Sequence, residues 1–179
     1  MPTGPGLQWS NLRTYVHLPS QTHIHVLNAL HALLLSRMFV LIVGAGRVGS
    51  AVAKSALAAG HEVSVLDEDP LSHERLDAGQ SKSWEDSGGQ FTVGTALETD
   101  ALIQAGIERA DAFIASTAGD NTNLVIAQLA QKRFGVEKSI VRVMDPARAD
   151  WYREQGLQTI SPTKHAIDMF QRALAPEAA

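Results

Sequence analysis

The sequence predicts an α/β protein with a doubly wound, parallel sheet of six strands. Short apolar runs alternate along the chain with longer amphipathic stretches, a pattern typical of parallel strands that are joined by helices. The first run, residues 39–43, is continuous and rich in β-branched side chains, as expected of a strand buried on both faces. Right-handed crossovers then cover both faces of the sheet and place any ligand at the carboxyl ends of the strands, where strand order reverses.

The alternation predicts each strand and helix in turn. The predicted strands are residues 39–43, 62–66, 90–93, 112–115, 139–143 and 157–160. The predicted helices are residues 47–59, 98–104, 121–134, 146–155 and 163–174, with weak helical character over residues 70–79. Gly60, Gly106 and Gly135 are placed to end three of these helices. Pro146 lies in the opening turn of another.

The folded domain is predicted to begin near Met38. Residues 1–37 show no regular strand pattern, so we interpret them as an N-terminal extension that contains at most one helix, near residues 22–36. Residues 38–179 then form a single domain, which agrees with the length of 179 residues.

Composition excludes several classes of function. The net charge of −4 provides no basic surface for nucleic acid. The absence of cysteine excludes disulfides, thiolate metal sites and cysteine nucleophiles. No segment approaches the roughly 20 apolar residues that cross a bilayer, so we expect no direct membrane insertion, and any role at a membrane requires a partner.

The strongest motif is the sequence GAGRVG at residues 44–49, which directly follows the first predicted strand and opens a helix. In this pattern Gly44 allows the tight turn, Gly46 lets the backbone approach phosphates, and Gly49 lets the helix pack against the strand. The helix N-terminus presents backbone N–H groups and a positive dipole end to the anion. Arg47 can reach a phosphate from this loop or remain an exposed arginine at the start of the helix.

An acidic residue stands where a ribose-binding carboxylate is expected. Asp67 closes the second predicted strand 18 residues after Gly49, near the offset of roughly 20 residues in Rossmann-type folds. A carboxylate here disfavours NADP, whose 2′-phosphate it repels, but it is compatible with NAD, NADH, ATP, ADP or AMP. The neighbouring Glu68 and Asp69 are more typical of solvated loop charges.

The sequence predicts no catalytic residues and no metal site. Tyr152 is followed four residues later by Gly156 rather than by lysine, so the tyrosine–lysine pair of short-chain dehydrogenases is missing. His165 opens the last helix, as a surface or capping histidine does. His23 and His25 have no further metal ligands at a useful spacing. Only one helix follows the sixth strand, which leaves no substrate domain.

The chain from Met38 to about Phe170 resembles the N-terminal nucleotide-binding domain of TrkA-type potassium-uptake regulators, also called the RCK or KTN domain. The resemblance rests on several motifs in this order. They are VGAGRVG at 43–49, GHEVSVLD at 60–67, AGIERADAFIA at 105–115, TAGDNTNL at 117–124, VRVMDP at 141–146 and ISP at 160–162.

This resemblance implies roles for individual residues. The glycine loop would bind phosphates, Asp67 the ribose, and the segment after the third strand the adenine. Relatives usually carry Gly-Asp-Ala in that segment, whereas this chain has threonine in the middle position, which leaves its selectivity for adenine open. The candidate cofactor-binding residues are Gly44, Ala45, Gly46, Arg47, Val48, Gly49, Asp67, Glu68, Gly94, Thr95, Ala96, Ser116, Thr117, Asn123 and Arg142.

The resemblance also implies a function and partners. The amphipathic helix at residues 163–174 would be the crossover helix that pairs two domains, although it could instead pack on its own sheet. The expected protein is a cytoplasmic homodimer or higher ring that binds NAD or NADH, or else ATP, ADP or AMP. It would regulate an integral-membrane potassium transporter subunit at the inner face of the membrane. Many relatives continue into a C-terminal ligand-binding domain, which we do not expect in a chain that stops at Ala179.

Two alternatives remain open at this stage. The first is a small NAD-dependent oxidoreductase whose substrate site is completed by a partner chain. The second is a regulatory domain of a potassium-efflux system rather than of an uptake system.

Overall fold

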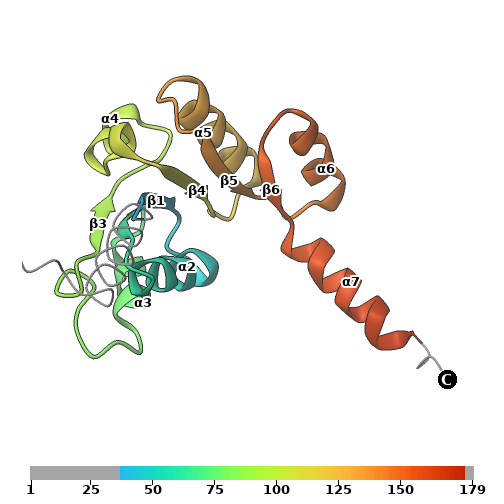
Figure 1. Cartoon of the computed structure of the whole chain (residues 1–179), viewed down its shortest axis with the longest axis horizontal. Helices are drawn as coiled ribbons and strands as arrows, with labels where there is room; N and C mark the ends of the chain where they lie inside the picture. Colours follow the sequence, from blue (N-terminus) through green and yellow to red (C-terminus); the bar gives the residue numbers. More distant parts are fainter. Residues whose placement is uncertain (1–36, 176–179) are drawn as a thin grey trace, which may run out of the picture. The chain divides into compact units, whose positions relative to one another are not determined.

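The computed structural model describes residues 37–175, and they form the predicted parallel sheet of six strands (Figure 1). The strands are β1 (Phe39–Val43), β2 (Glu62–Asp67), β3 (Gln90–Val93), β4 (Ala112–Ala115), β5 (Lys138–Arg142) and β6 (Gln158–Ile160). Their order is β3-β2-β1-β4-β5-β6, and every neighbouring pair is parallel. The predicted Rossmann-type topology is therefore confirmed. The predicted N-terminal helix lies outside the described residues.

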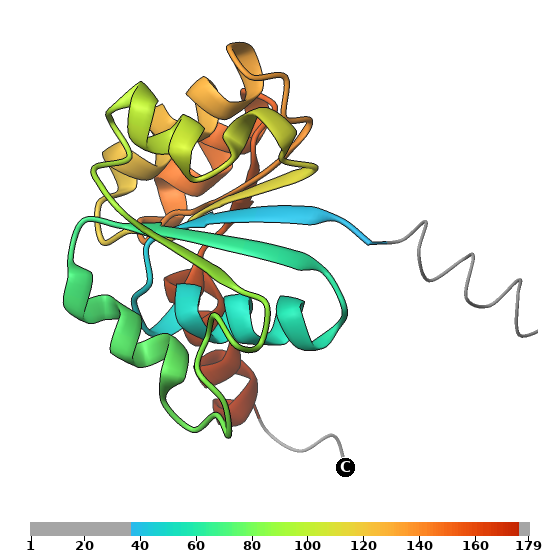
Figure 2. The ribbon, with the colours of Figure 1, turned by 90° about the vertical axis from the view of Figure 1, so that its left-hand side faces the viewer.

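Helices cover both faces of this sheet. They are α2 (Arg47–Ala58), α3 (Glu74–Asp77), α4 (Thr99–Gln104), α5 (Asp120–Lys132), α6 (Pro146–Glu154) and α7 (Pro162–Leu174). Figure 2 shows α2 and α3 on one face and α4, α5 and α6 on the other. The weakly helical stretch at residues 70–79 consists of a 3-10 helix, Pro70–His73, that continues into the single turn of α3.

The core has two layers because side chains alternate across β1. Val40 and Ile42 belong to the cluster packed under α2 and α3, whereas Leu41 and Val43 belong to the cluster under α4, α5 and α6. All five residues of β1 are buried. The predicted burial of this strand on both faces is confirmed, and β1 fixes the glycine loop that follows it.

Strand ends differ slightly from the predicted ones. Strand β2 runs one residue further, because Asp67 still pairs in register with Val93 of β3. Strand β5 begins and ends one residue early, at Lys138 and Arg142. Both shifts keep Asp67 and Arg142 at the carboxyl edge of the sheet.

Helix α7 extends away from the sheet (Figure 1). None of its residues is buried among the described residues, so the possibility that it packs on its own sheet is excluded for this part of the chain. In the described range, no helix combines the length and apolar character needed to cross a membrane.

Candidate functional site

A cleft of about 1060 Å³ lies at the carboxyl edge of the sheet. Its walls follow the ends of strands β1 to β5, so it spans the point between β1 and β4 where the strand order reverses. Twelve of the candidate residues line it: Gly44, Gly46, Arg47, Val48, Asp67, Glu68, Gly94, Thr95, Ala96, Ser116, Thr117 and Arg142. The other three, Ala45, Gly49 and Asn123, lie behind the cleft surface.

The glycine loop has the geometry of an anion-binding turn. Gly44 has a positive φ of 97°, and a Cβ there would lie 2.8 Å from the backbone nitrogen of Thr117. Gly46 is the N-cap of α2 and provides no side-chain acceptor for the first N–H groups of that helix. A Cβ on Gly46 would meet no atom within 4 Å, so the loop backbone is open to the cleft at this point.

Gly49 is buried because α2 packs directly against the glycine loop at this residue. A Cβ at this position would lie 1.8 Å from the carbonyl oxygen of Gly44 and 2.6 Å from Oγ of Ser116. The third glycine of the motif therefore serves close packing, as the sequence indicates.

The Asp67 carboxylate is hydrogen-bonded to the backbone of the glycine loop. Its Oδ2 accepts a hydrogen bond of 2.5 Å from the backbone nitrogen of Ala45, and its Oδ1 accepts one of 2.9 Å from the backbone nitrogen of Asp69. Ala45 is fully buried and contributes through this N–H group. The two bonds fix the carboxylate beside the loop, and a carboxylate can accept further hydrogen bonds from a ligand.

The β4–β5 half of the cleft is organised from behind by Asn123. This fully buried amide accepts hydrogen bonds from the backbone nitrogen (2.9 Å) and Oγ1 (2.7 Å) of Thr117. Its Nδ2 donates at 3.0 Å to the carbonyl oxygens of both Thr117 and Arg142. The Arg142 guanidinium also donates to the Thr117 carbonyl. Asn123 therefore shapes the loop that lines the cleft and does not face the cleft itself.

Ser116 also forms hydrogen bonds with the backbone behind the cleft. Its hydroxyl shares its proton between the carbonyl oxygens of Val43, at 3.1 Å, and Gly44, at 2.9 Å. The residue joins the end of β4 to the glycine loop, which leaves its oxygen lone pairs as the part that a ligand could use.

The structure adds lining residues that the sequence analysis did not select. Ser72 and Arg75 reach the cleft from the segment after β2, and Met144 and Pro162 from the segments after β5 and β6. The weak helical pattern of residues 70–79 gave no signal for which of its side chains face the ligand side. Arg47 and Arg75 both line the cleft, where a guanidinium can donate to an anion.

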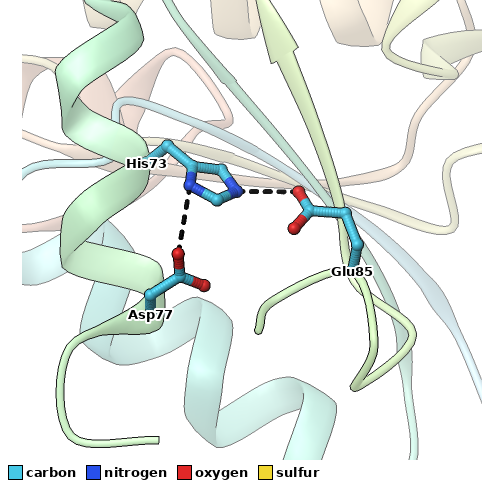
Figure 3. Close-up of side chains that lie close together, drawn as sticks. All are labelled: His73, Asp77 and Glu85. Carbon is cyan, nitrogen blue, oxygen red and sulfur yellow. Dashed lines mark hydrogen bonds and ion pairs between the residues drawn. The ribbon is translucent and has the colours of Figure 1, made fainter. Parts of the chain in front are cut away.

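A polar cluster beside the cleft fixes the segment that carries Ser72 and Arg75. In Figure 3 the His73 ring lies between two carboxylates, with Nε2 2.7 Å from Oε1 of Glu85 and Nδ1 3.3 Å from Oδ2 of Asp77. The backbone nitrogen of Trp84 donates to the other oxygen of Asp77 at 2.8 Å. Although the three side chains are close enough for a metal ion, each ring nitrogen faces a different carboxylate. The three side chains therefore form a compact polar cluster in which the imidazole joins the two carboxylates.

The TrkA-N domain model matches residues 40–162. The chain belongs to the TrkA-N domain family. It is 41% identical over 142 residues to the Trk system potassium uptake protein TrkA of Streptomyces coelicolor, a match that covers 79% of this chain and 60% of that protein. The resemblance inferred from the motifs is thus confirmed, and this TrkA-N chain spans less than two thirds of that relative's length.

Solved structures agree with this assignment. The TrkA-N domain of the inner membrane protein ybaL from Escherichia coli has a TM-score of 0.65 at 18% identity, covering 78% of this chain and 98% of that chain, and so shares the fold. The Kef CTD of Shewanella denitrificans, in an AMP-bound form, has a TM-score of 0.61 at 25% identity, covering 76% of this chain and 79% of that chain.

Proposed function

We propose that this TrkA-N domain is the nucleotide-sensing part of a regulator of potassium transport and that it has no catalytic activity of its own. The observation that carries the proposal is the cleft, in which an open glycine loop at the N-terminus of α2 is joined to the Asp67 carboxylate by a hydrogen bond. Phosphates bind at the loop and the helix dipole, and the ribose hydroxyls bind the carboxylate.

The ligand is a nucleotide with free ribose hydroxyls: NAD or NADH, or else ATP, ADP or AMP. The AMP in the Kef relative supports the adenine mononucleotides. Three adjacent acidic residues, Asp67, Glu68 and Asp69, line the ribose side of the cleft and would repel the 2′-phosphate of NADP.

The composition of the cleft supports binding without turnover. Among its described lining residues there is no histidine, lysine or tyrosine, which beside Asp and Glu are the side chains that most often transfer protons or activate a serine or threonine nucleophile. The alternative, a small oxidoreductase, would have to take such groups from a partner chain.

Helix α7 supports pairing of two copies. Ile167, Phe170 and Leu174 follow one another at spacings of three and four residues, which places them on one face of the helix. Phe170 is 71% exposed and Leu174 is 84% exposed, so this face is uncovered within the described chain. In the proposed homodimer or higher ring, the α7 face of each copy packs on its neighbour.

Regulation follows from differential binding. Two nucleotides that favour different arrangements of the paired domains shift the population between them. We propose that this shift opens or closes an integral-membrane potassium transporter subunit, which the domain contacts at the cytoplasmic face of the membrane. Uptake is the favoured direction, given the Streptomyces relative.

The binding site is tested by Asp67→Ala, with Asp150→Ala on the exposed face of α6 as the matched control. Loss of the ribose contact is expected to weaken ADP binding about tenfold or more, since hydrogen bonds to a charged group contribute about 1.5–3 kcal/mol. Isothermal titration calorimetry measures the effect. Equal affinities for Asp67→Ala and the control would contradict this placement of the ribose.

Pairing is tested by Phe170→Asp, with Val125→Asp as the control, because Val125 is an exposed apolar residue on α5. Multi-angle light scattering at micromolar concentration is expected to give a dimer or larger assembly for the parent chain and for the control. It should give a monomer for Phe170→Asp. A monomeric parent chain, with and without nucleotide, would refute pairing.

A further inference from the structure

A histidine and two carboxylates from separate segments meet beside the nucleotide cleft (Figure 3). His73 and Asp77 are four residues apart, where the 3-10 helix Pro70–His73 continues into α3, a spacing that brings two side chains together on one helical face. Glu85 comes from the loop between α3 and β3. None of these three residues lines the cleft, so the proposed nucleotide site does not use them.

Glu85 sets the orientation of the imidazole. Its Oε1 lies 2.7 Å from Nε2 of His73, and a carboxylate only accepts hydrogen bonds, so Nε2 carries the proton that is donated. The ring also packs edge-on against Phe91, with centroids 5.1 Å apart. In a neutral imidazole that donates from Nε2, the other nitrogen, Nδ1, keeps its lone pair. A carboxylate on one ring nitrogen is the usual support of a histidine that binds a metal through the other.

The Asp77 carboxylate is fixed from its far side. Its Oδ1 accepts a hydrogen bond of 2.8 Å from the backbone nitrogen of Trp84, and Trp84 is itself held by a bond of 3.0 Å from Nε1 to the Gln90 carbonyl oxygen. The other oxygen, Oδ2, faces Nδ1 of His73 at 3.3 Å. The side chains of His73 and Asp77 are 28% and 41% exposed, so an ion from solvent can reach both atoms.

Nδ1 and Oδ2 are two acceptors that face each other, and such a pair is favourable only with a cation between them. A shared proton holds nitrogen and oxygen at about 2.7–3.2 Å, which is shorter than the 3.3 Å found here. Zinc binds nitrogen at about 2.0–2.1 Å and carboxylate oxygen at about 2.0–2.2 Å, and a tetrahedral angle then separates the two ligand atoms by about 3.3–3.5 Å. The observed distance matches zinc coordination better than a hydrogen bond.

We propose that Nδ1 of His73 and Oδ2 of Asp77 bind a zinc ion, and that Glu85 is a positioning residue that orients the imidazole through Nε2. Water completes the coordination on the exposed side. Imidazole is a good ligand for zinc, whereas magnesium and calcium prefer sites made of oxygen atoms. The sequence alone does not indicate this site, because Glu85 reaches the histidine only through the folding of the loop before β3.

The ligands are tested by calorimetric titration of the full, EDTA-treated and dialysed chain with zinc chloride. His73→Ala and Asp77→Asn are each expected to remove one zinc site, and the asparagine keeps an acceptor for the Trp84 nitrogen. The matched controls are His165→Ala, an exposed histidine of α7, and Asp150→Asn on α6. Because residues 1–37 contain four further histidines, the result is the difference in zinc stoichiometry between each variant and its control.

The role of Glu85 predicts a graded effect. Glu85→Ala should keep the zinc stoichiometry but weaken binding at this site about tenfold to a hundredfold, as loss of a carboxylate behind a metal-bound histidine does, and Glu85→Gln should restore part of the affinity. Asp86→Asn, an exposed neighbour in the same loop, is the control. A tenfold excess of magnesium chloride over zinc should leave the zinc affinity unchanged.

Thermal melting gives an independent readout. With zinc at about 100 times its dissociation constant, the melting temperature of the parent chain and of the controls should rise by about 5 °C or more, and that of Asp77→Asn should rise less. A parent chain that binds no zinc, or ligand variants that bind as much zinc as their controls with equal affinity, would refute the site. Neither result would affect the nucleotide-sensing proposal, which is tested separately with nucleotides in the presence of EDTA.

Discussion

Replacing either of two loop glycines by alanine adds the same methyl group, but we expect Gly49→Ala to lower the stability of the fold and Gly46→Ala to lower the affinity for nucleotide. A Cβ on Gly49 would lie 1.8 Å from the carbonyl oxygen of Gly44, whereas ordinary contact begins at 3.4 Å. The helix and the loop must therefore separate by about 1.6 Å, the difference between these distances, or distort by an equivalent amount. Overpacking of this kind costs about 1–3 kcal/mol, and we expect the upper end because backbone rather than a flexible side chain must move.

Gly46→Ala should leave the fold nearly unchanged. Gly46 has φ −66° and ψ −173°, which alanine adopts without strain, and a Cβ there meets no atom within 4 Å. The lower entropy of the unfolded alanine chain and the weaker N-cap act in opposite directions, so the free energy of unfolding should change by less than about 1 kcal/mol. The methyl group instead occupies the space through which phosphates approach the backbone, and nucleotide affinity should fall about tenfold or more.

Urea denaturation followed by circular dichroism measures the free energy of unfolding, and isothermal titration calorimetry with ADP measures the nucleotide affinity. The expected result is a stability loss for Gly49→Ala and an affinity loss without a stability loss for Gly46→Ala. A Gly49→Ala protein as stable as the parent would refute the packing argument. A Gly46→Ala protein that binds ADP normally would refute the approach of phosphates at this loop.

Three further predictions concern the supports of the site and the domain boundary. Asn123→Ala should destabilise the domain by about 2–3 kcal/mol in urea denaturation, because it leaves buried backbone groups unpaired, whereas the exposed Asn121→Ala should have little effect. Asp145→Ala removes the N-cap of α6, where the carboxylate accepts from the backbone nitrogen of Ala147 at 2.9 Å, and should cost about 1 kcal/mol by the same measurement. Deletion of residues 1–37 should leave the calorimetric affinity for nucleotide unchanged; a loss of binding would show that the domain begins earlier than Met38.

Local sequence patterns were sufficient for most of the fold. The continuous apolar run of β1 required burial on both faces, and the three glycines of the loop required one specific turn between a strand and a helix. Asp67 was placed correctly at the edge of the cleft because its position depends only on the length of one strand–helix–strand unit.

Long-range placement could not be inferred in the same way. Trp84 is 1% exposed although its sequence neighbours are polar, because Gly89 packs against its ring and its Nε1 donates to the Gln90 carbonyl at 3.0 Å. Asn123 was expected to line the cleft, but its side-chain amide hydrogen-bonds to backbone groups of Thr117 and Arg142 behind the cleft surface. Such contacts depend on how a loop folds back on its helix, which periodicity does not encode.

The most direct test of the nucleotide-sensing proposal is calorimetric titration of the chain with NAD, NADH, ATP, ADP and NADP, each followed by an assay for chemical change. We expect at least one nucleotide with free ribose hydroxyls to bind, NADP to bind more weakly, and every nucleotide to be recovered unchanged. Turnover of NADH with a carbonyl substrate would instead indicate an oxidoreductase, and a complete absence of binding would contradict the nucleotide-sensing role.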